Sequence, residues 1–507
     1  MKSSKAKSRF PLTTAPLAAH ASQAAGHWPY APSWNSLKTH PTPRWFQEAK
    51  FGIYTHWGIY CVPGRGPNAT WYPYNMYREG TPQHAYHVQT YGDPSRFGYK
   101  DFIPRFTAEK FDPDEWAELF KLSGARYAGP VGEHHDGFCM WDTRYSEWSA
   151  ARMGPRRDVV GLLEKAIRRQ GLKFLVALHH AENWWFFPHW KKQYDTADPA
   201  YAGLYGEAHD LDTGQVDHHA GEKFFEQERP SARFLETWQG KIIELIDKYT
   251  PDVLWFDFGL RGVPDQYKQE FLAYYYNHAH AAGREVAVTY KDFDLAPGSG
   301  VVDLELGRMH HLTYNEWITD TTIDDGAGWG YLKETNYKSA TTLVHYLVDN
   351  VSKNGYLLLN VGPRPDGALP EQAHDLLRSI GRWMQVNGEA IYGATNWTAY
   401  GEGPTQVAPG AAFNEKKFGP FTASDIRFTS KDNNLYAICL GWPGAEVTIA
   451  TLKTLYPAEI RSVTMLGSDQ PLKWKMSAAG LTIETPAALP CEHAYVFKIV
   501  RGDPYPG

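Results

Sequence analysis

One carboxylate in this chain occupies an unusual place, at the end of an apolar run. The segment VLWFDFG, residues 253–259, has the composition of a buried strand and carries Asp257 between two phenylalanines. Burying a carboxylate without a partner is costly, so this placement indicates a polar cavity at the end of the strand. A helix N-cap and a core salt bridge are the competing structural explanations, and this segment alone does not separate them.

Histidines and a carboxylate gather at a second strand end. Residues 131–142, VGEHHDGFCMWD, place His134, His135 and Asp136 just after an apolar run. Together with His56 they form a set of metal-ligand type, which keeps a metal-dependent hydrolase as an alternative. Adjacent residues of a regular strand point to opposite faces, so both histidines are poorly placed to bind one ion. We expect them to bind hydroxyl groups instead, with no metal and no other cofactor.

Helical segments alternate with apolar strands from about residue 45 onward. Helices are expected over 114–124, 156–171 and 233–249, in a segment ending near Gly283, and from about 335; the strands that follow them are YAGPV, LKFLVALHH, VLWFDFG, EVAVTYKD and YLLLNVGP. This order predicts parallel strands joined by right-handed crossovers, in either a barrel or a doubly wound sheet.

The positions of the polar residues favour the barrel. A group of them falls at or just past the C-terminal end of a predicted strand: His56, His134, His135, His179, His180, Asp257, Lys291 and Glu305. In a barrel these ends converge on one mouth, whereas a doubly wound sheet would spread them along an edge. No GxGxxG or Walker loop opens a helix, which also argues against a nucleotide-binding sheet. We predict an α/β fold with a (β/α)8-like, TIM-type barrel over residues 41–395.

The pattern changes after about residue 396. Short segments of alternating polar and apolar residues, separated by turn signals, run from IRFTSKDNNLYAICLGW to AYVFKIV. They predict a C-terminal antiparallel β-sandwich over residues 396–507. The sandwich could be a carbohydrate-binding module or a structural cap on the barrel, and the sequence leaves both open.

Composition excludes several kinds of partner. The net charge is −6 and the lysines and arginines are dispersed, so no basic surface for nucleic acid is visible. No apolar run reaches the length of a membrane-spanning helix, and we expect no membrane partner. The four cysteines are far apart and form no CxxC pair. The oligomeric state and the redox compartment stay open.

The first 40 residues are expected to form a separate N-terminal tail. They begin with basic residues and continue into a mildly apolar stretch that ends in small residues near Ala19, although Pro11 and Pro16 interrupt it. This pattern resembles a secretory signal and predicts a secreted or periplasmic protein. A disordered tail on a cytoplasmic protein is the alternative.

Four ordered motifs resemble one known family. They are WFQEAKFGIYTHWGIY at 45–60, the stretch 106–142 that contains EHHDGF, the LWFDF strand, and KNGYLLLNVGPRPDG at 353–367. Over residues 41–395 the chain resembles the α-L-fucosidases of glycoside hydrolase family 29, which usually carry a C-terminal sandwich. The resemblance implies a retaining exo-α-L-fucosidase that removes terminal fucose from a fucosylated carbohydrate by double displacement.

The resemblance also implies roles for individual residues. Asp257 matches the nucleophile, and the residues expected to bind the sugar are His56, Trp71, His134, His135, Trp255 and Lys291. Candidates for an apolar wall against the C6 methyl group are Trp255, Phe256, Phe258 and Trp329.

A retaining mechanism needs a second carboxyl group, about 5–5.5 Å from the first, as acid and base. The candidates are Glu305, Glu316 and Asp303. Glu305 is favoured because it closes the short apolar run VVDLE, whereas Glu316 lies in the longer polar stretch HHLTYNEWITD and could equally be a solvated loop residue.

Three positions depart from the family pattern. Thr70 stands where many relatives carry Glu, Lys291 where many carry Arg, and Ile318 follows Trp317 where relatives often read Trp-Glu. Lysine cannot reproduce the bidentate grip of arginine. Two alternatives therefore stay open, a fucose-binding barrel without turnover and a related glycosidase that acts on α-L-galactosides.

Overall fold

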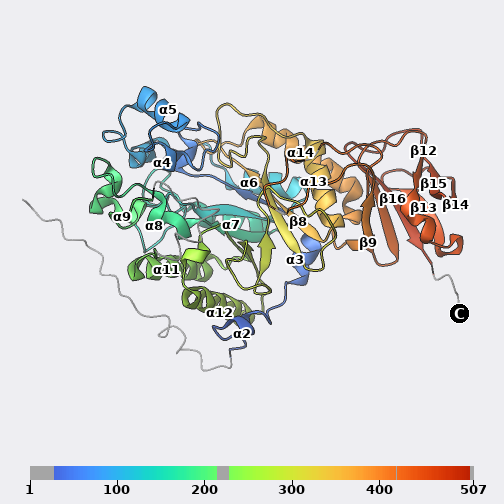
Figure 1. Cartoon of the computed structure of the whole chain (residues 1–507), viewed down its shortest axis with the longest axis horizontal. Coiled ribbons are helices and arrows are strands. Elements are labelled where there is room, and N and C mark those ends of the chain that lie inside the picture. The colour runs from blue at the N-terminus through green and yellow to red at the C-terminus, as the bar shows by residue number, and fades with distance from the viewer. Residues whose placement is uncertain (1–27, 214–227, 411, 418, 503–507) are drawn as a thin grey trace, which may run out of the picture.

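Eight parallel strands close into a barrel in the computed structural model, which describes residues 28–213, 228–410, 412–417 and 419–502 (Figure 1). Each strand pairs with the next along the chain, and β8 closes the ring on β1. The strands are β1 (Phe51–Thr55), β2 (Tyr127–Glu133), β3 (Lys173–Leu178), β4 (Val253–Phe256), β5 (Ala287–Lys291), β6 (Val301–Asp303), β7 (Trp317–Thr322) and β8 (Gly355–Val361). The predicted (β/α)8 barrel is confirmed.

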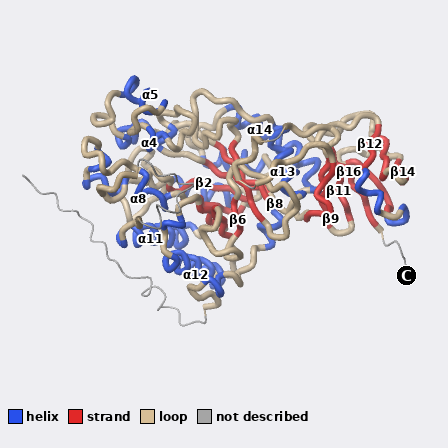
Figure 2. Tube along the Cα trace, viewed as in Figure 1, coloured by secondary structure: helices blue, strands red, loops and turns tan. Residues whose placement is uncertain are grey.

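Helices surround the strands on the outside of the barrel (Figure 2). The longer ones are α6 (Pro113–Leu122), α7 (Val159–Arg169), α11 (Ala232–Tyr249), α12 (Asp265–Ala281), α13 (Ala340–Ser352) and α14 (Glu371–Asn387). Side-chain caps decide where some of them begin. Ser339 Oγ accepts a hydrogen bond from the Thr342 amide at 3.0 Å, so α13 begins at Ala340 and not near residue 335 as predicted.

Strand β7 begins within the polar stretch HHLTYNEWITD, for which no strand was predicted. All six of its residues are buried, although the sequence WITDTT contains only two large apolar side chains. The polar members are satisfied inside the fold: Asp320, for example, lies 2.6 Å from Lys291 Nζ. Trp317, Ile318 and the three threonines of β7 are residue types common in strands, but Asp320 and the polar run before Trp317 obscure this signal.

The C-terminal region forms two antiparallel sheets, one with the strand order β13-β16-β11-β10-β9 and the other β12-β15-β14. Their strands are β9 (Thr395–Glu402), β10 (Ile426–Lys431), β11 (Asn434–Cys439), β12 (Glu446–Ile449), β13 (Ile460–Met465), β14 (Trp474–Ser477), β15 (Gly480–Glu484) and β16 (Tyr495–Arg501). One apolar core fills the space between the sheets, as the predicted sandwich requires. A buried pair, Arg427 Nε and Asp349 Oδ1 at 2.7 Å, joins β10 to α13 of the barrel.

Part of the expected N-terminal tail belongs to the barrel. Residues 28–40 contain helix α2 (Trp34–Leu37), and Asn277 of α12 accepts a hydrogen bond from the Tyr30 amide at 3.0 Å. The signal-like stretch within residues 1–27 lies outside the described residues. Within the described ranges, we find no helix with the length and apolar character needed to cross a membrane.

Candidate active site

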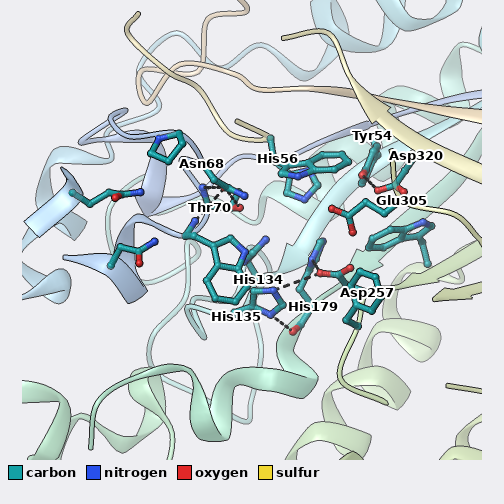
Figure 3. A pocket seen from close by; sticks show the side chains of 17 residues that line it. Tyr54, His56, Asn68, Thr70, His134, His135, His179, Asp257, Glu305 and Asp320 are labelled. Atoms are coloured by element: carbon teal, nitrogen blue, oxygen red, sulfur yellow. Dashed lines mark hydrogen bonds and ion pairs between the residues drawn. The ribbon is translucent and has the colours of Figure 1, made fainter. Parts of the chain in front are cut away.

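A cavity of about 250 Å³ lies at the C-terminal ends of the barrel strands (Figure 3). Its lining is mainly polar and aromatic: Tyr54, His56, Pro67, Asn68, Thr70, Trp71, Asn75, Gln83, His134, His135, His179, Trp255, Asp257, Phe258, Glu305, Asp320 and Trp329. The convergence of strand ends brings these residues together from segments spread over most of the barrel sequence.

Asp257 reaches the cavity through the alternation of β4. Trp255 faces the barrel interior, Phe256 faces outward against Phe271 of α12, and Asp257 follows on the inner side. Oδ2 of Asp257 lies 2.8 Å from Nδ1 of His179, and a carboxylate only accepts, so Nδ1 carries the proton. Asp257 is therefore neither a helix cap nor a member of a core salt bridge.

A second buried carboxyl group lies close to Asp257. His135 donates from Nδ1 to the backbone oxygen of His179 at 2.8 Å, which leaves Nε2 of the neutral ring as an acceptor. This Nε2 lies 3.5 Å from Asp257 Oδ2 and 3.7 Å from Glu182 Oε2. Burial, followed by the charge of Asp257, raises the pKa of Glu182 well above its usual value. Both effects favour the protonated form of Glu182, which lies beside the candidate nucleophile.

A cluster of acids surrounds one lysine beneath the cavity. Lys291 is fully buried, and its Nζ lies 2.6 Å from Asp320, 3.1 Å from Asp303 and 3.5 Å from Glu305. Tyr54 donates to Asp320 at 2.8 Å. The ammonium group offers three donors, and the carboxyl groups of Asp303, Glu305 and Asp320 surround it.

Glu305 is the member of this cluster that is both exposed to the cavity and protonated near neutral pH. Its side chain is 14% exposed, and it lines the cavity together with Asp257. Burial raises the pKa of Glu305 to about 8; Lys291 opposes this shift, and the charges of Asp320 and Asp257 add to it. In Figure 3 the Asp257 and Glu305 side chains lie on the same side of the cavity.

The histidines around the cavity are uncharged. Burial lowers the pKa of His56 to about 4 and lowers the pKa values of His134, His135 and His179. His56 Nδ1 donates to Asn360 Oδ1 at 2.8 Å, so its Nε2 is free to accept from a ligand hydroxyl.

Three of these histidines, His56, His134 and His179, have ring nitrogens close enough to suggest a metal site. The His134 and His179 rings are stacked, with centroids 4.2 Å apart and planes inclined by 21°. A histidine ligand binds an ion in its ring plane, so two nearly parallel rings are poorly placed to share one. Asp136, the fourth member of the metal set considered from the sequence, instead accepts from Tyr99 at 2.7 Å and does not line the cavity.

Comparison with known proteins agrees with this geometry. The Alpha-L-fucosidase family model matches residues 17–389, and the model of the Alpha-L-fucosidase C-terminal domain matches residues 420–500. The chain belongs to the α-L-fucosidase family.

Relatives within this family match almost the whole chain. The tissue α-L-fucosidase of Rattus norvegicus is 30% identical over 502 residues, covering 96% of each chain, and the α-L-fucosidase of Branchiostoma floridae is 32% identical over 505 residues, covering 93% of this chain and 95% of its own. The crystal structure of Thermotoga maritima α-fucosidase in complex with fucose superposes with a TM-score of 0.72 at 32% identity, covering 93% of this chain and all of that one. Family membership makes the chain a glycoside hydrolase.

Most residues expected from the fucosidase resemblance line the cavity. They are Asp257, Glu305, His56, Trp71, His134, His135 and Trp255. Both His134 and His135 do so because β2 ends at Glu133, so the two histidines are no longer on a regular strand. Trp255, Phe258 and Trp329 supply the apolar wall.

Four expectations need correction. Lys291 lies beneath the cavity, surrounded by the carboxyl groups of three residues, and does not line it. Phe256 faces away from the cavity. Glu316 precedes β7 at the opposite end of the barrel, where it accepts from Gln47 at 2.7 Å and from Tyr356. Asp303 is held by Trp255 Nε1 at 2.6 Å and by Lys291, and it does not reach the cavity.

Sequence reasoning missed several site residues. His179 was visible as a polar residue at a strand end but was not assigned to the site, while Glu182 and Asp320 gave no local signal. Where family members often carry Glu, Thr70 donates to Asn68 Oδ1 at 2.7 Å, and both residues line the cavity with Asn75 and Gln83. Neutral hydroxyl and amide side chains thus form this part of the cavity wall.

Proposed function

We propose that this protein hydrolyses terminal α-L-fucosyl linkages of fucosylated carbohydrates with retention of configuration. The observation that carries the proposal is the pairing of two carboxyl groups of different character in one small cavity. Asp257 accepts a hydrogen bond from His179 and is available as a nucleophile, and Glu305 has a pKa of about 8 and is available as an acid. Retaining glycosidases divide the two roles in this way.

In the proposed reaction, Asp257 Oδ attacks the anomeric carbon while Glu305 protonates the departing oxygen. A glycosyl ester of Asp257 forms, and the bond to the aglycone breaks. Glu305, now ionised, then removes a proton from a water molecule that attacks the same carbon and releases fucose and free Asp257.

Removal of one sugar at a time suits the size and lining of the cavity. Its volume is about 250 Å³, below the roughly 300–1,000 Å³ of sites for drug-sized ligands. A cavity of this size suits a single monosaccharide. Neutral histidines can accept from hydroxyl groups, and Trp255, Phe258 and Trp329 offer an apolar surface to a methyl group. Fucose differs from L-galactose in having this methyl group, which favours fucosides over α-L-galactosides.

Turnover of aryl α-L-fucosides by the protein and by its Asp257→Gly variant tests the proposal. Wild type should release the phenol and give α-L-fucose as the first product by NMR, whereas the variant should lose several orders of magnitude in kcat with its fold intact. Absence of turnover in wild type would favour a fucose-binding barrel without activity. Faster turnover of the matching α-L-galactoside would identify α-L-galactosides, not α-L-fucosides, as the preferred substrates.

We also propose that the protein is exported. The basic and then apolar order of the first residues supports this, and similar proteins include a plasma α-L-fucosidase of Homo sapiens, 32% identical over 497 residues. Fractionation of the producing cells, with N-terminal sequencing of the mature protein, tests it.

A further inference from the structure

The backbone that carries Glu305 is held by residues of the C-terminal region. The connection between β9 and β10 leaves the sandwich and returns to the barrel, where the Phe413 amide donates to the backbone oxygen of Glu305 at 2.8 Å. The amides of Asn414 and Glu415 donate to the backbone oxygen of Leu306 at 3.1 and 3.0 Å. Three consecutive amides therefore bind the Glu305–Leu306 segment directly.

Asn414 adds a side-chain clamp to these bonds. Its Oδ1 accepts from the Arg308 amide and its Nδ2 donates to the Arg308 carbonyl oxygen, both at 2.9 Å. Asn414 is 1% exposed, so these hydrogen bonds are shielded from water. An amide side chain that pairs with both backbone groups of one residue fixes the local chain direction.

Glu415 ties the same connection to β7. Its carboxylate accepts from Thr321 Oγ1 at 2.7 Å and lies 2.9 Å from Lys338 Nζ. On the other side of Glu305, the Leu304 and Leu306 amides donate to the β7 carbonyl oxygens of Ile318 and Asp320, at 2.8 and 3.0 Å. The segment that follows β6 is thus held between β7 and the β9–β10 connection.

Leu306 shows why this support matters. Its φ is 45°, in the left-handed region that a leucine adopts only at a cost in free energy. Such a conformation persists where the surrounding contacts determine it. The contacts that do so here come from β7 and from residues 413–415.

We infer that residues 413–415 of the C-terminal region are part of the catalytic apparatus: they are positioning residues that hold Glu305 where it can transfer a proton to the leaving group. They lie between the ranges matched by the two family models, 17–389 and 420–500. The inference rests on the proposed role of Glu305, and it gives the C-terminal region a role beyond that of a cap or a carbohydrate-binding module.

The test compares two substrates in the full-length protein: a fucosylated disaccharide, which needs protonation of its leaving group, and a nitrophenyl α-L-fucoside, which needs little. A general acid typically accelerates the reaction about 10²–10⁴-fold, and a misplaced acid should lose part of this effect. Asn414→Ala should therefore lower kcat/KM for the disaccharide by about tenfold or more. For the nitrophenyl fucoside, kcat/KM should fall by less than about threefold, because its leaving group needs little protonation. Glu415→Gln, a smaller change, should shift the ratio in the same direction.

Asn387→Ala is the matched control. Asn387 is also fully buried and donates to a backbone oxygen, that of Trp383 at 3.2 Å, but it lies on α14 away from Glu305. Its loss should lower Tm without changing the ratio of the two substrates. The inference would be overturned if Asn414→Ala lowered kcat/KM equally for both substrates. It would also be overturned if Asn414→Ala and Glu415→Gln both folded and both left the ratio of the two kcat/KM values unchanged.

A double-mutant comparison separates this inference from the proposed function. If the connection acts through Glu305, adding Asn414→Ala to Glu305→Ala should cost little further activity on the disaccharide. A fully additive loss would mean that Asn414 acts elsewhere. If Glu305→Ala alone shows no dependence on the leaving group, the assignment of Glu305 has failed instead.

Discussion

Nδ1 of His179 lies 2.8 Å from Oδ2 of Asp257, and the opposite ring nitrogen of His179 has no hydrogen-bond partner among the described residues. One edge of this neutral imidazole therefore orients the candidate nucleophile, while the ring itself lines the cavity. His179 reaches this position because β3 ends at Leu178, directly beside the end of β4.

Replacing His179 tests the importance of this hydrogen bond. A hydrogen bond to a charged group contributes about 1.5–3 kcal/mol, so His179→Ala should lower kcat by about 10- to 100-fold. His179→Asn can place an amide N–H near the position of Nδ1 and should recover part of the loss. Steady-state kinetics on an aryl α-L-fucoside measure both effects, and equal activity of the two variants would show that the hydrogen bond is not what matters.

The acid/base assignment predicts a dependence on the leaving group. Glu305→Ala should lower kcat/KM by about 10²–10⁴-fold for a fucosylated disaccharide and by much less for a nitrophenyl fucoside. Added azide should restore part of the aryl fucoside turnover by replacing the activated water. Glu316→Ala should show neither effect, because Glu316 is bound to Gln47 and Tyr356 at the other end of the barrel. The opposite result would move the role to Glu316.

The charge of Asp320 should be visible in the pH profile. Glu305 works as an acid only while protonated, so kcat/KM for the disaccharide should fall as the pH rises through about 8. The negative charge of Asp320 helps to raise the pKa of Glu305, so removing it lowers that pKa. In Asp320→Asn the alkaline fall should therefore begin at a lower pH. A fall at unchanged or higher pH would contradict the proposed coupling.

Chelation tests the interpretation of the histidines. Because the His134 and His179 rings are stacked, we expect these histidines to form hydrogen bonds with sugar hydroxyl groups and not to bind a shared metal ion. Prolonged dialysis against EDTA should leave kcat and KM unchanged. A loss of activity that Zn²⁺ or Mn²⁺ restores would establish a metal site at His56, His134 and His179.

Local patterns in the sequence were sufficient for much of the architecture. The alternation of helical and apolar segments predicted parallel strands, and the polar residues at the strand ends favoured a barrel over a doubly wound sheet. The alternation of polar and apolar residues after residue 396 predicted the sandwich. Asp257 stood out for the same reason, since a carboxylate at the end of an apolar strand needs a special environment. In each case the signal lies within a few neighbouring residues, where backbone periodicity determines which face a side chain takes.

Only the tertiary structure decided which polar residues share the site. Asp320 of β7 is buried against Lys291, and the Glu305 segment is supported by Asn414, whose bond to Arg308 spans 106 positions of the chain. Lys291 was expected at the cavity but lies beneath it, where its ammonium group contacts Asp303 of β6 and Asp320 of β7. The pairing that makes a buried polar group stable is a long-range contact, and a local sequence pattern contains no record of its partner.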